Sequence, residues 1–170
     1  MPRRDPLLAY NFQVSLFESG RSTGAAVGLT PVAGFSECAG LEGTLEVQDH
    51  PEGGLNGTVL RFPTRIKWSN LTFKRGLGRG MELWTWFYGF ASGTGVRKDG
   101  VITLQNERHE PHTVWGFRRG LPVKYAGPTL NAAQSAVAVE SLEIAHEGLF
   151  LIPATAPPGQ AGRAVADLFR

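Results

Sequence analysis

Three stretches of the sequence combine residue types that do chemistry in other proteins, and the first is rich in glycine. Gly76, Gly78 and Gly80 lie between a strand-like run and an apolar segment, where a phosphate cradle could form. A dinucleotide fingerprint needs G-x-G-x-x-G, and a P-loop needs Gly-Lys-Ser or Gly-Lys-Thr at the helix start. Here the segment opens Gly-Met-Glu, and Glu82 would place negative charge where an anion must bind. We interpret this stretch as a turn between a strand and a helix.

The second and third stretches fail for different reasons. His109, Glu110 and His112 resemble the zinc-peptidase pattern H-E-x-x-H, but one residue is missing and Pro111 forbids the helix that this pattern needs. A turn with solvated charges is the better interpretation. Cys38 lies in ECAG, which is no recognisable nucleophile setting, and we expect a small buried side chain there. We therefore predict no catalytic, cofactor-binding or metal site, and no enzyme.

Length and composition indicate a folded, nearly neutral chain. The 170 residues suit one domain, with 42% hydrophobic and 19% charged residues and a formal charge of +2. One cysteine excludes an internal disulfide framework. The first residues lack the apolar core of a secretory signal, and no run of about 18 apolar residues could cross a bilayer. We expect synthesis in the cytoplasm, no membrane embedding, and any release by a route without that signal.

Alternating polar and apolar residues predict a mainly β fold with antiparallel strands, either a sandwich or a barrel. The chain divides into a β domain over residues 1–152 and a Pro-rich C-terminal extension over 153–170. Residues 121–130 are expected to be irregular because of their prolines and Gly127. The predicted strands cover 11–17, 35–49 with a break at two glycines, 58–68, 71–73, 98–106, 113–118 and 136–146.

Two strand patterns carry specific predictions. In residues 58–68, the even-numbered positions from Leu60 to Trp68 should share one apolar face, with Pro63 on the other face at a sheet edge. In residues 136–146, the apolar phase slips between Val139 and Leu142, which predicts a β-bulge near Glu140.

A single helix is predicted over residues 80–91, flanking the β domain. It is apolar on nearly every side, whereas a surface helix normally shows one apolar stripe. Loops of the same chain could cover the excess, but we favour a subunit interface. The residues assigned to this interface are Met81, Trp84, Phe87 and Tyr88.

Basic residues form a second candidate surface, which could face a lumen or a neighbouring subunit. Aromatic residues do not interleave with them, so a nucleic-acid stacking platform is unsupported. A solvated face, or pairing with a neighbour's Glu140, Glu143 and Glu147, explains them better. The residues concerned are Arg61, Arg65, Lys67, Lys74 and Arg75.

Five motifs in a fixed order resemble the tail tube proteins of contractile phages and contractile injection systems. They are NFQVSLF, GFSECAGLEGTLEVQDHPEGG, LTFKRGLGRGMELWTWF, LPVKYAGPTLNA and VAVESLEIAHEGL, and together they span about residues 7–152. The most specific pieces are FSECAGL, the Glu-Gly-Gly loop, and LTFKRG. The type VI secretion tube protein resembles this family as a distant structural relative.

The resemblance implies a structural subunit without a cofactor, with other copies of itself as its main partner. Hexameric rings would stack into a hollow tube inside a sheath, with baseplate and cap proteins at the ends and an effector or DNA in the lumen. The loop that would reach the next protomer or ring contains Glu52, Gly53, Gly54, Leu55 and Asn56. The residues alone leave open a non-catalytic β-sandwich binding module acting as a monomer or dimer.

Overall fold

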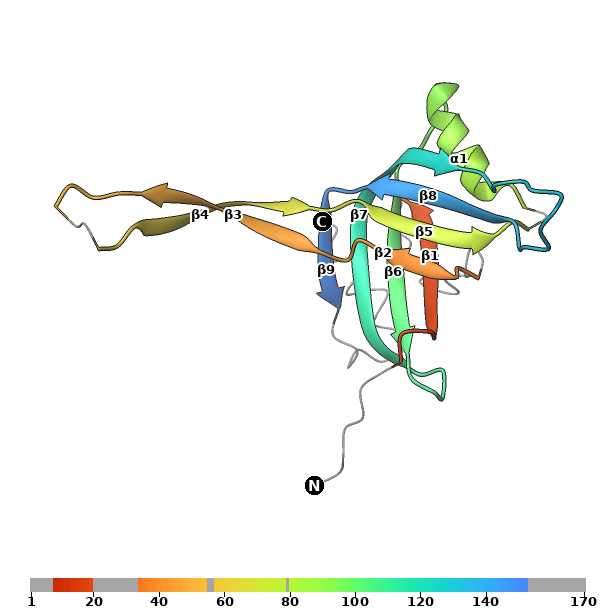
Figure 1. The fold of residues 1–170 in the computed structure, drawn as a ribbon, viewed down its shortest axis with the longest axis horizontal. Helices are drawn as coiled ribbons and strands as arrows, with labels where there is room; N and C mark the ends of the chain where they lie inside the picture. The colour runs from red at the N-terminus through yellow and green to blue at the C-terminus, as the bar shows by residue number, and fades with distance from the viewer. Residues whose placement is uncertain (1–7, 20–33, 55–56, 79, 153–170) are drawn as a thin grey trace.

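The computed structural model describes residues 8–19, 34–54, 57–78 and 80–152, and most of them lie in antiparallel strands. Figure 1 shows a β body with one helix at its edge and a long two-stranded projection. The predicted fold class, mainly β with one flanking helix, is confirmed. The elements are β1 (Phe12–Glu18), β2 (Glu37–Ala39), β3 (Gly43–His50), β4 (Leu60–Trp68), β5 (Leu71–Gly76), α1 (Glu82–Ala91), β6 (Lys98–Gln105), β7 (Pro111–Ala126), β8 (Val139–Ala145) and β9 (Gly148–Ile152).

Strand β7 joins the two layers of the body. The strand order is β1-β6-β7-β8-β5-β2, and β9 also pairs with β7. The first part of β7 pairs with β6 and β9, and its last part, from Leu121, pairs with β8. The strand therefore belongs to both layers, and the chain turns from one to the other near Arg119.

A buried carboxylate holds the bend in β7. Arg119 has a left-handed backbone (φ 49), which is unfavourable for a residue with a side chain. Its N–H donates to Oδ1 of Asp99 at 2.6 Å, and the hydroxyl of Ser19 donates to the same oxygen at 2.6 Å. Hydrogen bonds to a charged, buried acceptor are strong, so they offset the cost of the strained bend.

The core lies between the two layers and extends under the helix. Phe73 on β5 and Phe117 on β7 meet across it, with ring centroids 6.3 Å apart. Residues from β1 and β6 line one side and residues from β5 and β8 line the other, so packing between layers fixes their relative position. The buried cluster contains Val14, Leu71, Phe73, Leu83, Trp86, Ile102, Phe117, Leu142 and Ile144.

Two elements depart from the sequence-based predictions in the last third of the chain. Residues 121–126 were expected to be irregular but continue β7, and Pro122 pairs with Ile144. A register shift between Pro122 and Lys124 accommodates the proline at an irregular point of the ladder. Strand β9 was not predicted, and it pairs with β7 along its length.

The predicted bulge near Glu140 is absent. Strand β8 keeps an unbroken register against β5, from Ile144 opposite Leu71 to Val139 opposite Gly76. Glu140 is itself buried, with 1% of its surface exposed, whereas Val139 is 40% exposed. The apolar phase slipped in the sequence because a glutamate occupies an interior position, which hydrophobic periodicity alone cannot show.

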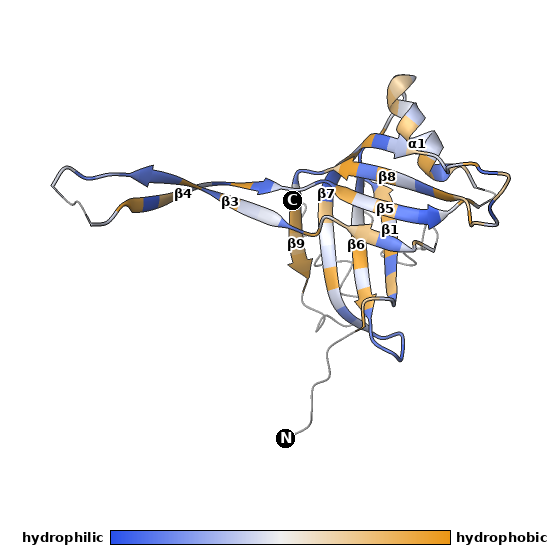
Figure 2. Cartoon of the chain, in the orientation of Figure 1, coloured by the Kyte–Doolittle hydropathy of each residue, from blue (hydrophilic) through white to orange (hydrophobic). Residues whose placement is uncertain are grey.

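Strands β3 and β4, together called the arm, form a separate two-stranded sheet that projects from the body (Figure 1). Nearly all of their residues are exposed on both faces. Apolar colour recurs along the arm in Figure 2, between hydrophilic segments. An isolated hairpin of two strands is marginally stable in water, so the arm needs support beyond its own pairing.

The predicted single apolar face of β4 is wrong. Leu45 pairs with Ile66, and Val47 pairs with Pro63, so β4 contains one more residue than β3 between these two pairs. The extra residue is a β-bulge around Thr64, and it shifts side chains to the opposite face. Paired residues share a face, and therefore the two groups separate: Ile66 and Trp68 lie with Leu45 and Val47, whereas Leu60 and Phe62 lie with Gln48 and His50.

The arm meets the body at a close crossing of two chain segments. Gly40 has φ +91, and a Cβ built there would lie 2.0 Å from the carbonyl oxygen of Asn70. The side-chain amide of Asn70 donates to Glu143 on β8 at 2.8 Å. His146 Nε2–H donates to the Ser69 carbonyl at 3.0 Å, and burial lowers the pKa of this imidazole. These contacts fix both segments that lead into the arm.

We predict that Gly40→Ala lowers the free energy of unfolding by more than about 1 kcal/mol, because alanine is strained at this φ and would strike a backbone oxygen. Chemical denaturation followed by tryptophan fluorescence measures the change. Gly53→Ala is the matched control, since a Cβ there meets nothing within 4 Å. Equal effects of the two substitutions would contradict the prediction.

Candidate subunit interface

One side of helix α1 is fixed on the body. The predicted helix over 80–91 is confirmed within two residues, as α1 covers Glu82–Ala91. Leu83 and Trp86 are buried in the core, and Trp86 Nε1–H donates to the carbonyl of Val96 at 2.8 Å. Phe87 is half-buried against the same core, so it packs within its own chain. The excess of apolar residues is therefore only partly covered by the protomer itself.

The other side of the helix exposes the surface here called the aromatic face, which consists of Met81, Trp84 and Tyr88. These side chains are 65%, 37% and 54% exposed. Trp84 stacks on Tyr88 with ring centroids 5.6 Å apart, which orders both rings. Large, ordered, amphipathic rings are typical of interface hot spots. Three of the four predicted helix residues thus form a surface that another molecule could cover.

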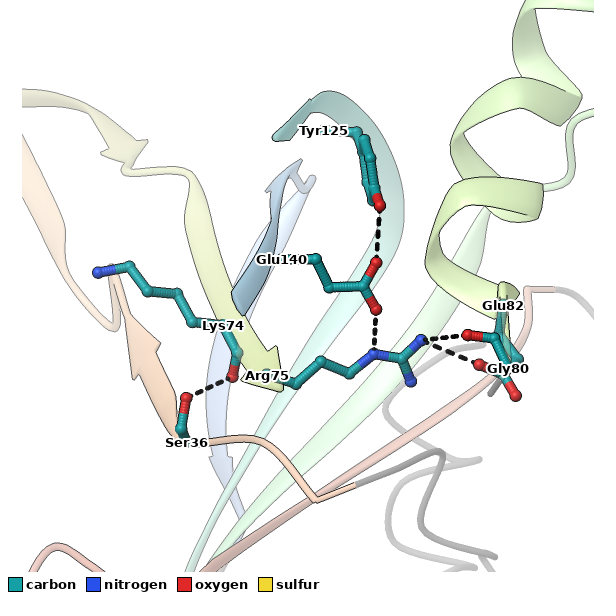
Figure 3. A network of polar contacts seen from close by, with 7 residues as sticks. All are labelled: Ser36, Lys74, Arg75, Gly80, Glu82, Tyr125 and Glu140. Carbon is teal, nitrogen blue, oxygen red and sulfur yellow. Dashed lines mark hydrogen bonds and ion pairs between the residues drawn. The ribbon is translucent and has the colours of Figure 1, made fainter. Parts of the chain in front are cut away.

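A chain of side-chain contacts connects the aromatic face to the interior. Trp84 packs edge-on against Tyr125 at a centroid distance of 5.1 Å. The Tyr125 hydroxyl donates to one oxygen of Glu140 at 2.7 Å, and Arg75 Nε donates to the other at 2.6 Å (Figure 3). Burial, followed by the bond to Glu140, raises the pKa of Tyr125, so the phenol keeps its proton as a donor.

Arg75 extends this contact chain to the start of α1. Its Nη2 donates to Glu82 at 2.9 Å and to the carbonyl of Gly80 at 3.4 Å (Figure 3). Burial disfavours the charged guanidinium, but the hydrogen bonds to Glu140 and Glu82 outweigh it and raise the pKa of Arg75. The same bond to Arg75 lowers the pKa of Glu82. The network thus pins the first turn of the helix to β5 and β8.

Arg75 and Glu140 are corrections to the predicted charged surface. Arg75 is 4% exposed, so it cannot line a lumen, and its partner Glu140 belongs to the same chain rather than to a neighbour. Glu143 accepts from Asn70, and Glu147 pairs with Arg97, again within the chain. The sequence showed the charges but not their pairing, which depends on the strand register.

The remaining basic residues do not form one row. Arg61 pairs with Asp49 at 3.2 Å on one face of the arm, and Arg65 pairs with Glu46 on the other. Lys67 is exposed on the same face as Arg65. On the body, Lys74 Nζ lies 2.9 Å from the carboxylate of Glu37. The bulge in β4 places Arg61 on the opposite face of the arm from Arg65 and Lys67, with which the sequence pattern grouped it.

The Glu-Gly-Gly loop lies at the far end of the arm, where β3 leads toward β4 (Figure 1). Glu52, Gly53 and Gly54 are exposed, and Gly54 adopts φ +96, which favours glycine. The other two predicted loop residues, Leu55 and Asn56, lie outside the described residues. The arm therefore carries this loop well away from the body.

The glycine-rich stretch connects β5 to α1, the histidine stretch is a turn that leads into β7, and Cys38 lies on β2. Asn106 Oδ1 accepts the N–H groups of Arg108 and Glu110, which closes the turn that contains His109. Across the described ranges, no group of three or more His, Cys, Asp or Glu side chains could hold a metal ion. No helix in this part of the chain has the length and apolarity to cross a membrane.

The fold and this surface define a class of mainly β proteins with an exposed two-stranded arm and one flanking helix. The sequence profile of the T4-like virus tail tube protein gp19 family matches residues 8–150, so the chain belongs to this family. That match confirms the resemblance inferred from the sequence motifs and the assignment to a non-enzymatic structural family. Among curated proteins, none matches this chain.

Solved structures share the fold. A chain from the anti-feeding prophage baseplate superposes with a TM-score of 0.77 at 24% identity, covering 90% of this chain and 99% of that one. A chain from the sheath-tube complex of an extracellular contractile injection system, PVC, gives 0.72 at 19% identity, covering 87% and 92%. An Hcp protein gives 0.53 at 11% identity, covering 85% and 94%. The tail tube fold therefore covers nearly the whole chain.

We predict that Arg75→Ala lowers the free energy of unfolding by about 3–5 kcal/mol, because it leaves the carboxylate of Glu140 buried without its charged partner. Arg61→Ala is the control, since it removes an exposed ion pair and should cost less than about 1 kcal/mol. Urea denaturation of both variants gives the comparison. Similar losses would show that the buried pair has no special role.

We predict that Cys38 reacts slowly with maleimide in the folded protein. Burial and the nearby charge of Glu37 raise the pKa of this thiol from 9.0 to about 12. At pH 8 the reactive thiolate is then about a thousandfold scarcer than at an ordinary cysteine. Mass spectrometry of native and urea-unfolded protein measures the labelling rates, and equal rates in the two states would contradict the prediction.

Proposed function

We propose that this tail tube protein forms hexameric rings that stack into the hollow inner tube of a contractile injection particle or phage tail. Membership of the tail tube family over residues 8–150 carries the proposal. The exposed surfaces of the protomer support it, because the arm and the aromatic face present apolar side chains to water. Surfaces of this kind are typical of protein–protein contacts.

The strands support the same assembly. In the described part of the chain, β1 and β2 end the strand order of the body, and the arm has only two strands. Unpaired strand edges attract further pairing, and a closed ring of subunits would cover them. The Glu-Gly-Gly loop at the end of the arm would then contact the next protomer or ring, as proposed for Glu52, Gly53, Gly54, Leu55 and Asn56.

The partners follow from this assembly. We propose sheath, baseplate and cap proteins as neighbours, supported by similar chains in structures of a baseplate, a sheath-tube complex and a tube-terminating cap. An effector or DNA would occupy the lumen, with Arg61, Arg65, Lys67 and Lys74 as candidates for a charged lining. The protein would be made in the cytoplasm, assembled into the particle and released with it.

The domain division remains part of this proposal. A tube-forming domain over residues 1–152 would build the rings, and the Pro-rich segment over 153–170 would contact a partner of the tube. The segment lies outside the described residues, so its composition alone supports the role.

We predict that the purified protein forms rings or tubes. Six copies of the 18.4 kDa chain make a particle of about 110 kDa, which light scattering coupled to size exclusion detects. Negative-stain microscopy then shows rings or stacks with a central hole. A stable particle of one or two chains at high protein concentration would instead support a small binding module.

We predict that Trp84→Glu abolishes ring formation while the protein stays folded, because it places a charge in the aromatic face. Trp84 is 37% exposed, so the carboxylate can remain in water in the free protomer. Trp84→Phe is the control and should assemble, since it keeps an apolar ring. Phe87 is unsuitable for this test because it also packs in the core. Tubes formed by Trp84→Glu would exclude the aromatic face as an interface.

A further inference from the structure

The half of the arm next to the body has one apolar side and one charged side. Leu45 and Ile66 form a cross-strand pair, are 53% and 55% exposed, and share their face with Val47. The opposite face of the same half carries the ion pair between Glu46 and Arg65. Contiguous exposed apolar side chains of this kind are typical of surfaces that contact another protein.

The outer half of the arm also has one apolar side and one charged side, but they lie on the opposite faces of the sheet. Phe62 is 52% exposed and contacts His50 on one face, with ring centroids 6.1 Å apart. The ion pair between Asp49 and Arg61 occupies the opposite face of the outer half. This is the same face of the sheet that carries Leu45 in the inner half.

The bulge in β4 causes this reversal. Without the extra residue near Thr64, all even-numbered residues of β4 would share one face, as the sequence predicted. With it, the apolar side changes from one face to the other halfway along the arm. If the bulge served only to bend the strand, the outer half would not need apolar side chains on the face that carries Phe62. Their presence on that face indicates a second contact, separate from the one made by the inner half.

We propose that the arm is held from opposite sides by two different copies of this chain, one on the Leu45 and Ile66 side of the inner half and the other on the Phe62 side of the outer half. This inference rests on the proposed tube assembly. A single copy lying along one face would bury an ion pair at a desolvation cost and leave the other apolar group in water.

Copies of this chain fit both sides. Arg61 and Arg65 are paired within the arm, with Asp49 and Glu46, and Lys67 lies on the charged side of the inner half. Each apolar side therefore needs an uncharged partner surface rather than a complementary charge. The protomer itself presents such a surface in its aromatic face. The two-stranded arm would gain from both contacts the support that its own pairing lacks.

Cysteine accessibility tests the proposal in assembled tubes. Four variants place a single reactive thiol on each side of each half: Leu45→Cys and Thr44→Cys in the inner half, and Phe62→Cys and Arg61→Cys in the outer half. Each is doped into an excess of wild-type protein, so that assembly does not depend on the variant. Maleimide labelling in tubes is compared with labelling of the same substitution in the unassembled Trp84→Glu background.

We expect labelling at Leu45→Cys and Phe62→Cys to slow at least tenfold in tubes, and labelling at Thr44→Cys and Arg61→Cys to change less than threefold. Protection that follows one face, at Leu45→Cys with Arg61→Cys or at Thr44→Cys with Phe62→Cys, would overturn the proposal. Equal protection, or none, at all four positions would also overturn it. Failure of wild-type protein to form tubes would instead overturn the proposed function.

Photo-crosslinking then counts the copies. A benzophenone amino acid at positions 45 and 62 of one chain, doped into wild-type tubes, should produce three linked chains after irradiation, whereas each single substitution should produce two. Products with at most two chains from the doubly substituted protein, when both single substitutions crosslink, would show that one copy contacts both sides.

Discussion

The position of the helix on the body depends on a buried carboxylate, that of Glu140. Glu140 occupies a core position on β8 and accepts hydrogen bonds from Arg75 on β5 and Tyr125 on β7. Through Arg75 the same network reaches Glu82 in the first turn of α1. Removing ions from water is costly, and here the cost is offset by bonds that satisfy both carboxylate oxygens. The network therefore fixes β5, β7, β8 and the first turn of α1 relative to one another.

The orientation of the helix decides what the protomer exposes. With the first turn of α1 held and Trp86 buried, Trp84 and Tyr88 must point away from the core. The arm is constrained in the same manner at its base by Gly40 and Asn70. The two surfaces that assembly would bury are therefore set by interactions inside one chain, before any other copy is present. Such preorganisation lowers the entropy cost of association.

Local patterns in the sequence were sufficient for much of the fold and for part of the surface. Alternation identified the strands that became β1, β4 and β6, and the run from Met81 to Phe90 identified the helix. What failed depended on pairing between distant strands. The bulge opposite Glu46, the partner of Glu140, and the continuation of β7 past Arg119 all follow from register, which no single strand encodes. Contacts between copies depend on the assembly, so the pattern of a single strand or helix does not encode them.

The close crossing at the base of the arm has a mechanical consequence. A change of angle at the base of the arm moves its far end by a distance that grows with the length of the arm. Because the backbone at Gly40 touches that of Asn70, the arm has little freedom to pivot there. If the arms contact the next ring, the angle of the arm at this crossing would influence the rotation between successive rings. Gly40 would then contribute to the helical pitch of the assembled tube.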